Sequence, residues 1–563
     1  MPTLMSRRIH ISPKSICFVI VLSVLFAVFL ARGQGVAQPA AGWFAQPYEL
    51  PKDVFDLPEF DQFRTSGRLN VEAAGRFLEG LSDKDLPAAQ HLFDIFAWKA
   101  FVALNSPANS NGTPETRPVG EIGNGPLLWE FWEQSSNIFL HNGARPTWAN
   151  SPKPSIDHFK AGWRQNTTVN EGKQAFSGPL IDQNGNWLHY VSFVNRREFD
   201  YLVEHELYNL EGQAAFSNNN KVEFPLNDDT NYGAIEIKLA LKELTPSEVS
   251  SGRFLTRSLP VVEYRPAPCA VTVEATPPAH HSGRTTDNPG NPPNQTKTLG
   301  LVGMHIAMRT RSSPQWIWAT FEQIDNTRLD LESGDTRHPL PAHPSLANPN
   351  NPDALVTANL LPVYNGPSCN NQPPNDWDES KKLPPVETLR LVPPPRGTEE
   401  VNKLAQAFLG SKASVLRYYE LDGTQWPKHP KVPAVPGGQG SAPESIIRKM
   451  PGEMVPVYLT NATMETYFQK GFQQAGPLEQ DDRLSAQFSV DTTLVFGTES
   501  CVGCHYSAGV CLGFRKDPAG NLLHDANGNK IPIFGENGND GLTGNANFSW
   551  MLQLEAKAKN PKQ

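Results

Sequence analysis

Three long stretches that are dense in proline, asparagine or glycine divide the chain, at residues 266–296, 338–397 and 427–443. Such residues interrupt helices and central strands and favour turns, so we expect surface loops or linkers there. Because 39% of the 563 residues are hydrophobic, the segments between these loops can bury a core. A wholly disordered chain is therefore excluded.

The pattern of apolar residues predicts helices and strands between the loops. A helix at 87–105 is apolar around most of its circumference, which indicates that it is buried. Further elements are predicted as a turn at Asn184-Gly185 before a strand, a helix at 196–209, strands at 234–241, 254–264, 299–309 and 316–322, one or two helices within 398–420, and a closing helix at 547–559. The sequence therefore predicts an α+β fold, with a β-rich body that also holds helices at 38–395 and a smaller, mainly helical region at 396–563.

The first 37 residues have the pattern of an export signal. Arg7, Arg8 and Lys14 accompany a 16-residue apolar run, and Gly35-Val36-Ala37 supplies the small residues of a cleavage site. A helix of that length spans about 24 Å, less than the ~30 Å core of a bilayer, which favours cleavage. An uncleaved, tilted anchor is the alternative. We expect a periplasmic or secreted protein, with membrane contact only if the signal is retained.

The charge balance excludes one class of partner. The chain holds 49 Lys and Arg against 58 Asp and Glu, and cleavage of the signal would remove basic residues only. A protein that binds nucleic acid by neutralising phosphates needs the opposite balance. A basic partner protein would suit this acidic chain.

The segment Cys501-Val502-Gly503-Cys504-His505 has the spacing of a covalent haem attachment motif. Two thiols within one turn of chain can form thioethers with the two vinyl groups on one edge of a porphyrin, and the adjacent imidazole is then placed under the iron. We predict one covalently bound haem c, attached through Cys501 and Cys504, with His505 as the proximal iron ligand.

In these residues the chain resembles a mono-haem cytochrome c. Together with its segments at 101–105, 300–306 and 316–322, it is similar to large exported bacterial proteins of the cytochrome c family that have no assigned activity. The resemblance implies one-electron transfer with a redox partner protein, which it does not identify.

The sequence leaves the sixth ligand of the iron open. Met551 is expected in the closing helix, His524 in a hairpin-like loop and His305 in a strand, and packing or solvent exposure is the simpler explanation for each. An iron without a sixth protein ligand would suit a peroxidase-like haem oxidoreductase, which is the alternative function.

Other hypotheses need no haem. Cys501, Cys504 and Cys511 with His505 could hold zinc, although two adjacent ligands rarely converge on one tetrahedral ion. A redox dithiol would need a thioredoxin-like βαβ context, which the sequence does not indicate. A secreted binding protein with merely structural cysteines is the remaining alternative.

Cleavage of the signal would remove Cys17 and leave an odd number of cysteines. We predict a disulfide between Cys269 and Cys369, which leaves Cys511 as a free thiol. A bridge from Cys511 to one of those loops is the alternative.

Two further patterns have both a structural and a functional explanation. Trp316 and Trp318 share one face of a predicted strand, as sheet core or as a platform for the haem. The segments that begin with Asp182 and Asp525 share the pattern Asp-x-Asn-Gly-Asn, which predicts hairpin turns. Neither segment combines the Gly and Glu that a calcium loop requires.

Overall fold

The computed structural model of the protein describes residues 49–70, 80–115, 119–120, 125–149, 182–184, 186, 188–261, 295–329, 343–346, 389–390, 394–428, 430, 454–456, 459–465, 501–505, 508–525, 528–535 and 544–559. All of them belong to one compact unit, Gln46–Gln563. The predicted signal and the predicted partners Cys269 and Cys369 lie outside the described residues.

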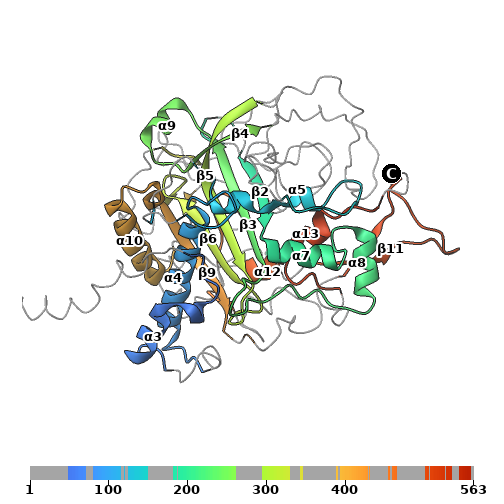
Figure 1. Ribbon diagram of the computed structural model, residues 1–563, viewed down its shortest axis with the longest axis horizontal. Coiled ribbons are helices and arrows are strands. Elements are labelled where there is room, and N and C mark those ends of the chain that lie inside the picture. Colours follow the sequence, from blue (N-terminus) through green and yellow to red (C-terminus); the bar gives the residue numbers. More distant parts are fainter. Residues whose placement is uncertain are drawn as a thin grey trace, which may run out of the picture. The chain divides into compact units, whose positions relative to one another are not determined.

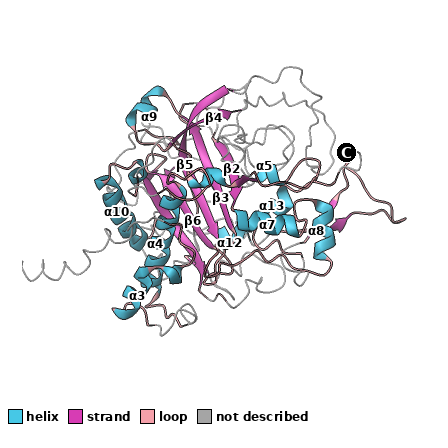
Figure 2. Cartoon of the chain, in the orientation of Figure 1, coloured by secondary structure: helices cyan, strands magenta, loops and turns pink. Residues whose placement is uncertain are grey.

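Helices and strands are mixed along the chain (Figures 1 and 2). The helices are η1 (Val54–Asp56), α3 (Pro58–Thr65), α4 (Leu86–Leu104), η3 (Leu128–Phe131), α5 (Ser135–Ile138), α7 (Arg196–Glu204), α8 (Leu210–Ser217), α9 (Pro246–Ser251), α10 (Arg396–Ser411), η7 (Val415–Tyr418), α12 (Cys501–His505) and α13 (Trp550–Leu554). The strands are β1 (Glu133–Gln134), β2 (His189–Val194), β3 (Ile235–Glu243), β4 (Thr256–Val261), β5 (Gln295–Met308), β6 (Ile317–Gln323), β7 (Arg328–Leu329), β8 (Leu389–Arg390), β9 (Tyr419–Pro427), β10 (Met454–Val455), β11 (Cys511–Phe514) and β12 (Pro532–Phe534).

An antiparallel sheet of eight strands forms the centre of the fold. Its order is β1-β2-β3-β5-β6-β9-β10, and β4 pairs with the first half of β5. β5 is the longest strand of the described residues, with 14 residues, and β3 pairs with residues 299–308 of it. The predicted strands at 234–241, 254–264, 299–309 and 316–322 correspond to β3, β4, β5 and β6. The mixed α+β fold expected from the sequence is confirmed.

One face of the sheet, here called the helical face, is covered by α4 and α10 (Figure 1). Phe101 of α4 stacks on Phe321 of β6, with ring centroids 4.2 Å apart. Asp94 of α4 is completely buried there and accepts a hydrogen bond of 2.8 Å from Thr398 of α10, and burial raises its pKa to about 7. The buried helix predicted at 87–105 is confirmed as α4, because its large apolar side chains leave almost none of its circumference exposed.

The opposite face, here called the C-terminal face, packs against segments from the end of the chain. The Tyr190 hydroxyl of β2 donates to the backbone oxygen of Thr463 at 2.7 Å, and Asn461 Nδ2 donates to Thr320 Oγ1 of β6 at 2.8 Å. A core cluster on this face joins Val194, Ala307 and Trp318 of the sheet to α7, α8, α12 and α13. The two faces of one sheet therefore bury different parts of the chain.

The boundary expected at 395/396 falls inside this sheet. β9 and β10 come from the region beyond it, and β9 pairs with β6 over six residue pairs. The described part of that region holds four strands besides its helices. β9 begins at Tyr419, directly after the helical turn η7. The helices predicted within 398–420 therefore extended two residues into this strand.

Left-handed backbone shortens two predicted helices. α7 ends at Glu204, before the 209 expected, because Glu206 has a φ of 54° that a right-handed helix does not accommodate. The closing helix predicted at 547–559 is reduced to α13, and Asn547 and Phe548 before it have φ values of 51° and 74°. Trp316, with a φ of 68°, lies just before β6 rather than in it.

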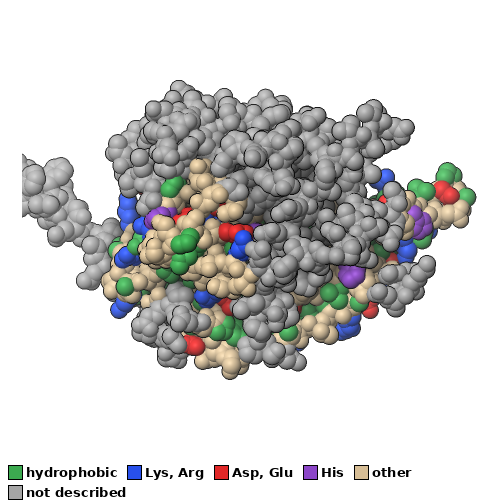
Figure 3. All heavy atoms as spheres, turned by 90° about the horizontal axis from the view of Figure 1, so that it is seen from above, with side chains coloured by type: hydrophobic (Ala, Val, Ile, Leu, Met, Phe, Trp, Pro, Cys, Tyr) green, Lys and Arg blue, Asp and Glu red, His purple; other side chains and the backbone are tan. Residues whose placement is uncertain are grey.

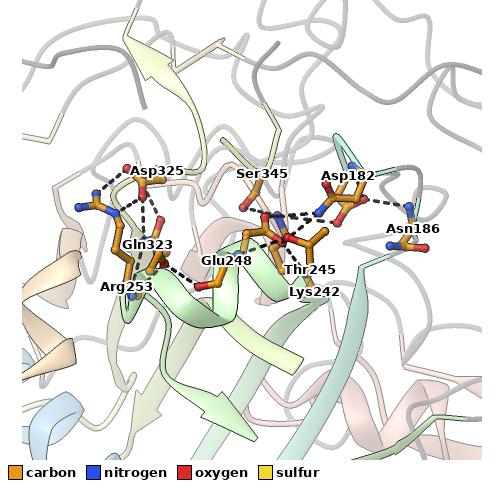
Figure 4. Close-up of polar contacts among 11 residues, drawn as sticks. Asp182, Asn186, Lys242, Thr245, Glu248, Arg253, Gln323, Asp325 and Ser345 are labelled. Carbon is orange, nitrogen blue, oxygen red and sulfur yellow. Dashed lines mark hydrogen bonds and ion pairs between the residues drawn. The ribbon is translucent and has the colours of Figure 1, made fainter. Parts of the chain in front are cut away.

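A buried lysine ties three segments together at one end of β3 (Figure 4). Lys242 is completely buried, and its Nζ donates to Glu248 Oε1 of α9 at 2.6 Å and to Ser345 Oγ at 3.3 Å. Asp182 Oδ2 lies 3.8 Å from the same nitrogen. Burial raises the pKa of Asp182 to about 6, although the charge of Lys242 opposes that rise.

The predicted turn that begins at Asp182 has a structural role. Asp182 Oδ1 accepts the backbone N–H groups of Asn184 and Asn186, at 2.9 and 2.8 Å. The similar segment at Asp525 forms a turn closed by Asn529, whose backbone N–H donates to Asp525 Oδ1 at 2.8 Å. Both side chains cap backbone groups of their own turns. The turn at Asp525 belongs to a hairpin with a bridge between His524 and Lys530, whereas the chain before Asp182 lies outside the described residues.

Replacement of Lys242 by Met leaves Glu248 and Asp182 buried without their cation. Removal of one partner from a buried ion pair costs about 3–5 kcal/mol, so we expect Lys242→Met to lower the free energy of unfolding by that amount in urea denaturation. The control is Lys559→Met, which removes the exposed pair with Glu206 and should cost less than about 1 kcal/mol. Equal losses in the two variants would contradict this prediction.

Candidate functional site

The Cys501–His505 segment forms α12, a single helical turn that is anchored to β9. The backbone N–H of Val502 donates to Gln425 Oε1 at 2.9 Å, and Gln425 Nε2 donates to the Pro456 oxygen at 2.7 Å. Val502 is completely buried in the core cluster of the C-terminal face. The side-chain amide of Gln425 therefore holds the first turn of the motif against the sheet.

The two cysteines of the motif lie three residues apart in a helix, which places them on the same side of it. Cys501 and Cys511 are free thiols, so Cys501 and Cys504 do not form a disulfide with each other. Burial raises the pKa of Cys501 well above its usual value, and the negative charge of Glu465 acts in the same direction. Cys501 is therefore a neutral thiol at pH 7, in contrast to the low-pKa thiolate of a redox dithiol.

The imidazole of His505 is held in one orientation by a backbone carbonyl. His505 Nδ1 lies 2.7 Å from the oxygen of Phe548, which only accepts hydrogen bonds, so Nδ1 carries the proton and Nε2 presents a lone pair. Burial lowers the pKa of His505 to about 4, and the charges of His305 and Lys238 reinforce this shift. Histidines that ligate metals typically make this bond with their other ring nitrogen.

An aromatic side chain of the sheet packs against this imidazole. The rings of Trp318 and His505 are centred 4.5 Å apart, with a tilt of 50°. Trp316 lies next to Trp318, with centroids 6.0 Å apart, and its Nε1 donates to the Asn547 oxygen at 3.1 Å. Trp316 and Trp318 both belong to the core cluster that includes Val502. Trp318 is thus sheet core and also a wall of the candidate site.

His305 of β5 belongs to the same neighbourhood. Its Nε2 lies 2.8 Å from Glu465 Oε1, and its charge acts on His505. Lys238 of β3 is its cross-strand neighbour. Burial would raise the pKa of Glu465, but the charge and hydrogen bond of His305 hold it below its usual value. The C-terminal face therefore brings an ion pair close to the motif.

The other two candidates for a sixth ligand have different surroundings. Met551 of α13 is buried in the core cluster of the C-terminal face. His524 is exposed and forms a β-bridge with Lys530 in a surface hairpin. Of the three, only His305 contributes to the electrostatic shift of His505.

Sequence reasoning missed the residues that support the motif. Gln425, Glu465 and Phe548 lie between 36 and 76 residues from the nearest end of the motif, and none has a distinctive spacing relative to it. Phe548 acts through its backbone oxygen, which any residue carries. The Asn-rich segment before α13 indicates a turn, and the turn is what brings this oxygen to His505.

Other expectations concern metal and membrane binding. The described residues contain no group of three or more His, Cys, Asp and Glu side chains arranged to hold a metal ion. Cys511, which the zinc hypothesis requires, is buried on β11, where its Sγ lies 3.2 Å from the Gly513 oxygen. Within the described residues, no helix is both long and apolar enough to span a bilayer.

No family model, curated protein or solved structure matches the chain.

The orientation of His505 can be tested in the haem-free chain. Because the pKa of His505 is about 4, we expect a neutral imidazole with its proton on Nδ1 from pH 7 down to about pH 5. Below pH 6.5 the unfolded chain binds a proton that the folded chain does not, so the free energy of unfolding should fall as the pH decreases toward 4. Nitrogen-detected NMR of the imidazole measures the tautomer and its titration, and His505→Asn should remove this part of the pH dependence. A proton on Nε2 at pH 7 would contradict the assignment.

Proposed function

We propose that the protein is an exported c-type cytochrome that carries one covalent haem c and transfers single electrons. The observation that carries the proposal is the pairing of two cysteines on one helical turn with a neutral imidazole whose Nδ1 proton is held by Phe548. In this proposal Cys501 and Cys504 carry the thioethers and His505 binds the iron through Nε2.

The surrounding residues fit such a group. Bound haem would supply a one-electron couple, with its iron alternating between ferric and ferrous states. Phe548 and Trp318 fix the rotation of the His505 ring, and the low pKa of that ring keeps a lone pair available. Apolar side chains from α7, α8 and α13 pack in one core cluster with Val502 of α12, whereas Cys501, Cys504 and His505 remain partly exposed. These are the features by which a protein orients a haem ligand and tunes its iron.

A redox partner protein would complete this function. The acidic chain suits a basic partner in the periplasm or outside the cell. On the face drawn in Figure 3, the visible Lys and Arg side chains among the described residues are interspersed with Asp and Glu side chains. Docking there would depend on local complementarity rather than on one large charged patch.

A second candidate function is a peroxidase-like haem oxidoreductase. The observation that favours it is the ion pair between His305 and Glu465, whose bond occupies the Nε2 atom that commonly ligates iron. A histidine beside an open iron site could move a proton to and from bound peroxide, and Glu465 would orient it. A haem-free secreted binding protein is the remaining alternative.

Covalent attachment is tested by expression with a c-type haem attachment system. We expect the wild-type chain to gain the mass of one haem and to keep its Soret band after denaturation, because thioethers survive unfolding. The double variant Cys501→Ala/Cys504→Ala should gain no mass. The control is Cys511→Ala, which removes a nearby thiol outside the motif and should still carry haem. A wild-type chain without added mass would refute the proposal and favour the haem-free alternative.

The spin state of the iron separates the two haem functions. For an electron carrier with two protein ligands, we expect a low-spin spectrum that cyanide and carbon monoxide leave unchanged. Among the variants His305→Ala and Met551→Leu, the one that becomes high-spin identifies the sixth ligand. A high-spin wild-type protein that binds cyanide would instead support the second candidate, and His305→Ala should then slow the reaction with peroxide by about 100-fold.

A further inference from the structure

Two glutamates face each other beneath the C-terminal face without a cation. Glu198 of α7 is completely buried, and both of its carboxyl oxygens lack a hydrogen-bond donor. Glu236 of β3 is partly buried, with Oε1 shielded from solvent and equally without a donor. Among the described residues, no Lys, Arg or His side chain contributes to the pKa shift of either group. We call Glu198 and Glu236 the carboxyl pair.

The carboxyl pair is expected to hold a proton near neutral pH. The two carboxyl groups lie close enough to act on each other's pKa, and a hydrogen bond between them can form only when one of them is protonated. Burial, followed by repulsion from Glu236, raises the pKa of Glu198 well above its usual value, and burial raises that of Glu236 to about 7. Two buried carboxylates without a cation rarely both ionise, so the pair titrates as a unit.

The carboxyl pair lies in the same cross-strand row as the wall of the candidate haem site. Glu236 pairs with Ala307 of β5, Ala307 with Trp318 of β6, and Trp318 with Gln425 of β9. Residues that pair directly in an antiparallel sheet share a face. Trp318 contacts the His505 ring and Gln425 binds the first turn of α12. With strands about 4.8 Å apart, Glu236 and Trp318 are separated by about 10 Å.

A second connection runs through the two residues that precede α13. Interaction with Ser549 lowers the pKa of Glu236, against the larger effect of burial. Ser549 directly follows Phe548, whose oxygen holds the Nδ1 proton of His505. The same short segment therefore contacts both the carboxyl pair and the ring that would ligate the iron. Since the His505 ring is centred 4.5 Å beyond the Trp318 ring, the carboxyl pair acts over about 10–15 Å. At an effective dielectric constant near 20, one unit charge at that distance changes an equilibrium by roughly tenfold.

We propose that the carboxyl pair is a proton-binding site coupled to the redox state of the haem. It takes up one proton from water when a one-electron donor protein reduces the iron from ferric to ferrous, and it releases that proton when the iron is oxidised. The added electron and the added proton cancel, so the net charge of the buried site stays constant. This inference rests on the proposed function, because it needs haem at His505.

Other ionisable groups on the neighbouring elements are already engaged. Lys238 and His305 lie one row along the same face, and His305 binds Glu465. Tyr201 lies one turn beyond Glu198 on α7, and its hydroxyl accepts the backbone N–H of Glu223 at 2.9 Å. None of the three contributes to the pKa shifts of the carboxyl pair. Glu236 is thus the titratable residue of its own cross-strand row, and Glu198 is its partner.

The test is a potentiometric titration of the haem-loaded protein between pH 5 and 9. Reduction should become harder as the pH rises through about 7, with a change of roughly tenfold in the reduction equilibrium over the whole range, about 59 mV for one electron. Glu236→Gln keeps the shape of the side chain but takes up no proton, and it should remove most of this dependence. Glu198→Gln should do the same, and it serves as a second variant if the first fails to fold.

The control is Asp94→Asn. Asp94 is also buried, and its pKa is likewise about 7, but it lies on the helical face, so the pH dependence should remain as in the wild type. A wild-type potential that does not change with pH would overturn this inference, as would a slope that survives in Glu236→Gln. These outcomes in a protein that carries haem leave the proposed function standing, whereas a chain without haem overturns both.

Protonation of the carboxyl pair has an independent readout in the wild-type protein. Infrared spectroscopy should show the C=O stretch of a protonated buried carboxyl at pH 6. At pH 7 this band should lose intensity when the iron is oxidised, and Glu236→Gln should abolish this loss. A band that is the same in both oxidation states would overturn the inference.

Discussion

The antiparallel pairing of β5 with β3 on one side and β6 on the other decides where the side chains of the site point. Successive residues of a strand alternate between faces, so Met304 and Ile306 enter the core of the helical face while His305 lies on the C-terminal face. A slip of one residue would bury His305 under α4 and expose the apolar residues to the motif. The core and the candidate site therefore depend on one register, which the bulky apolar residues of the helical face keep in place.

Close approach of the chain to β5 brings Glu465 to His305. At Gly303, an added Cβ would lie 2.2 Å from Thr463 Oγ1, so only glycine permits the 459–465 segment to lie this near the strand. Asn461 then bonds to Thr320 and Tyr190 to the backbone of Thr463. These bonds hold the 459–465 segment against the sheet, and Glu465 at its end then lies opposite His305.

The parts of the fold that could be predicted from the sequence are those with a local signal. α4 was predicted because it is apolar around most of its circumference, and β3, β5 and β6 because they are rich in β-branched or aromatic residues with turn residues between them. The motif has its signal in five consecutive residues. Its supports have none, since Phe548 acts through a backbone oxygen and Glu465 contacts a residue 160 positions away. β9 was missed because its pairing with β6 is set by tertiary contacts, whereas its sequence directly continues a helix.

The C-terminal face limits its charge by two different means, and this explains why the carboxyl pair matters there. His305 and Glu465 bind each other, whereas burial keeps His505 and Cys501 uncharged. His505 and Cys501 would have to move far from their preferred states to change charge near pH 7, because an isolated buried ion is expensive. A new charge at His505 is also weakly screened in such surroundings. Burial raises the pKa of Glu236 to about 7, so the carboxyl pair can respond to such a charge at this pH with little free energy.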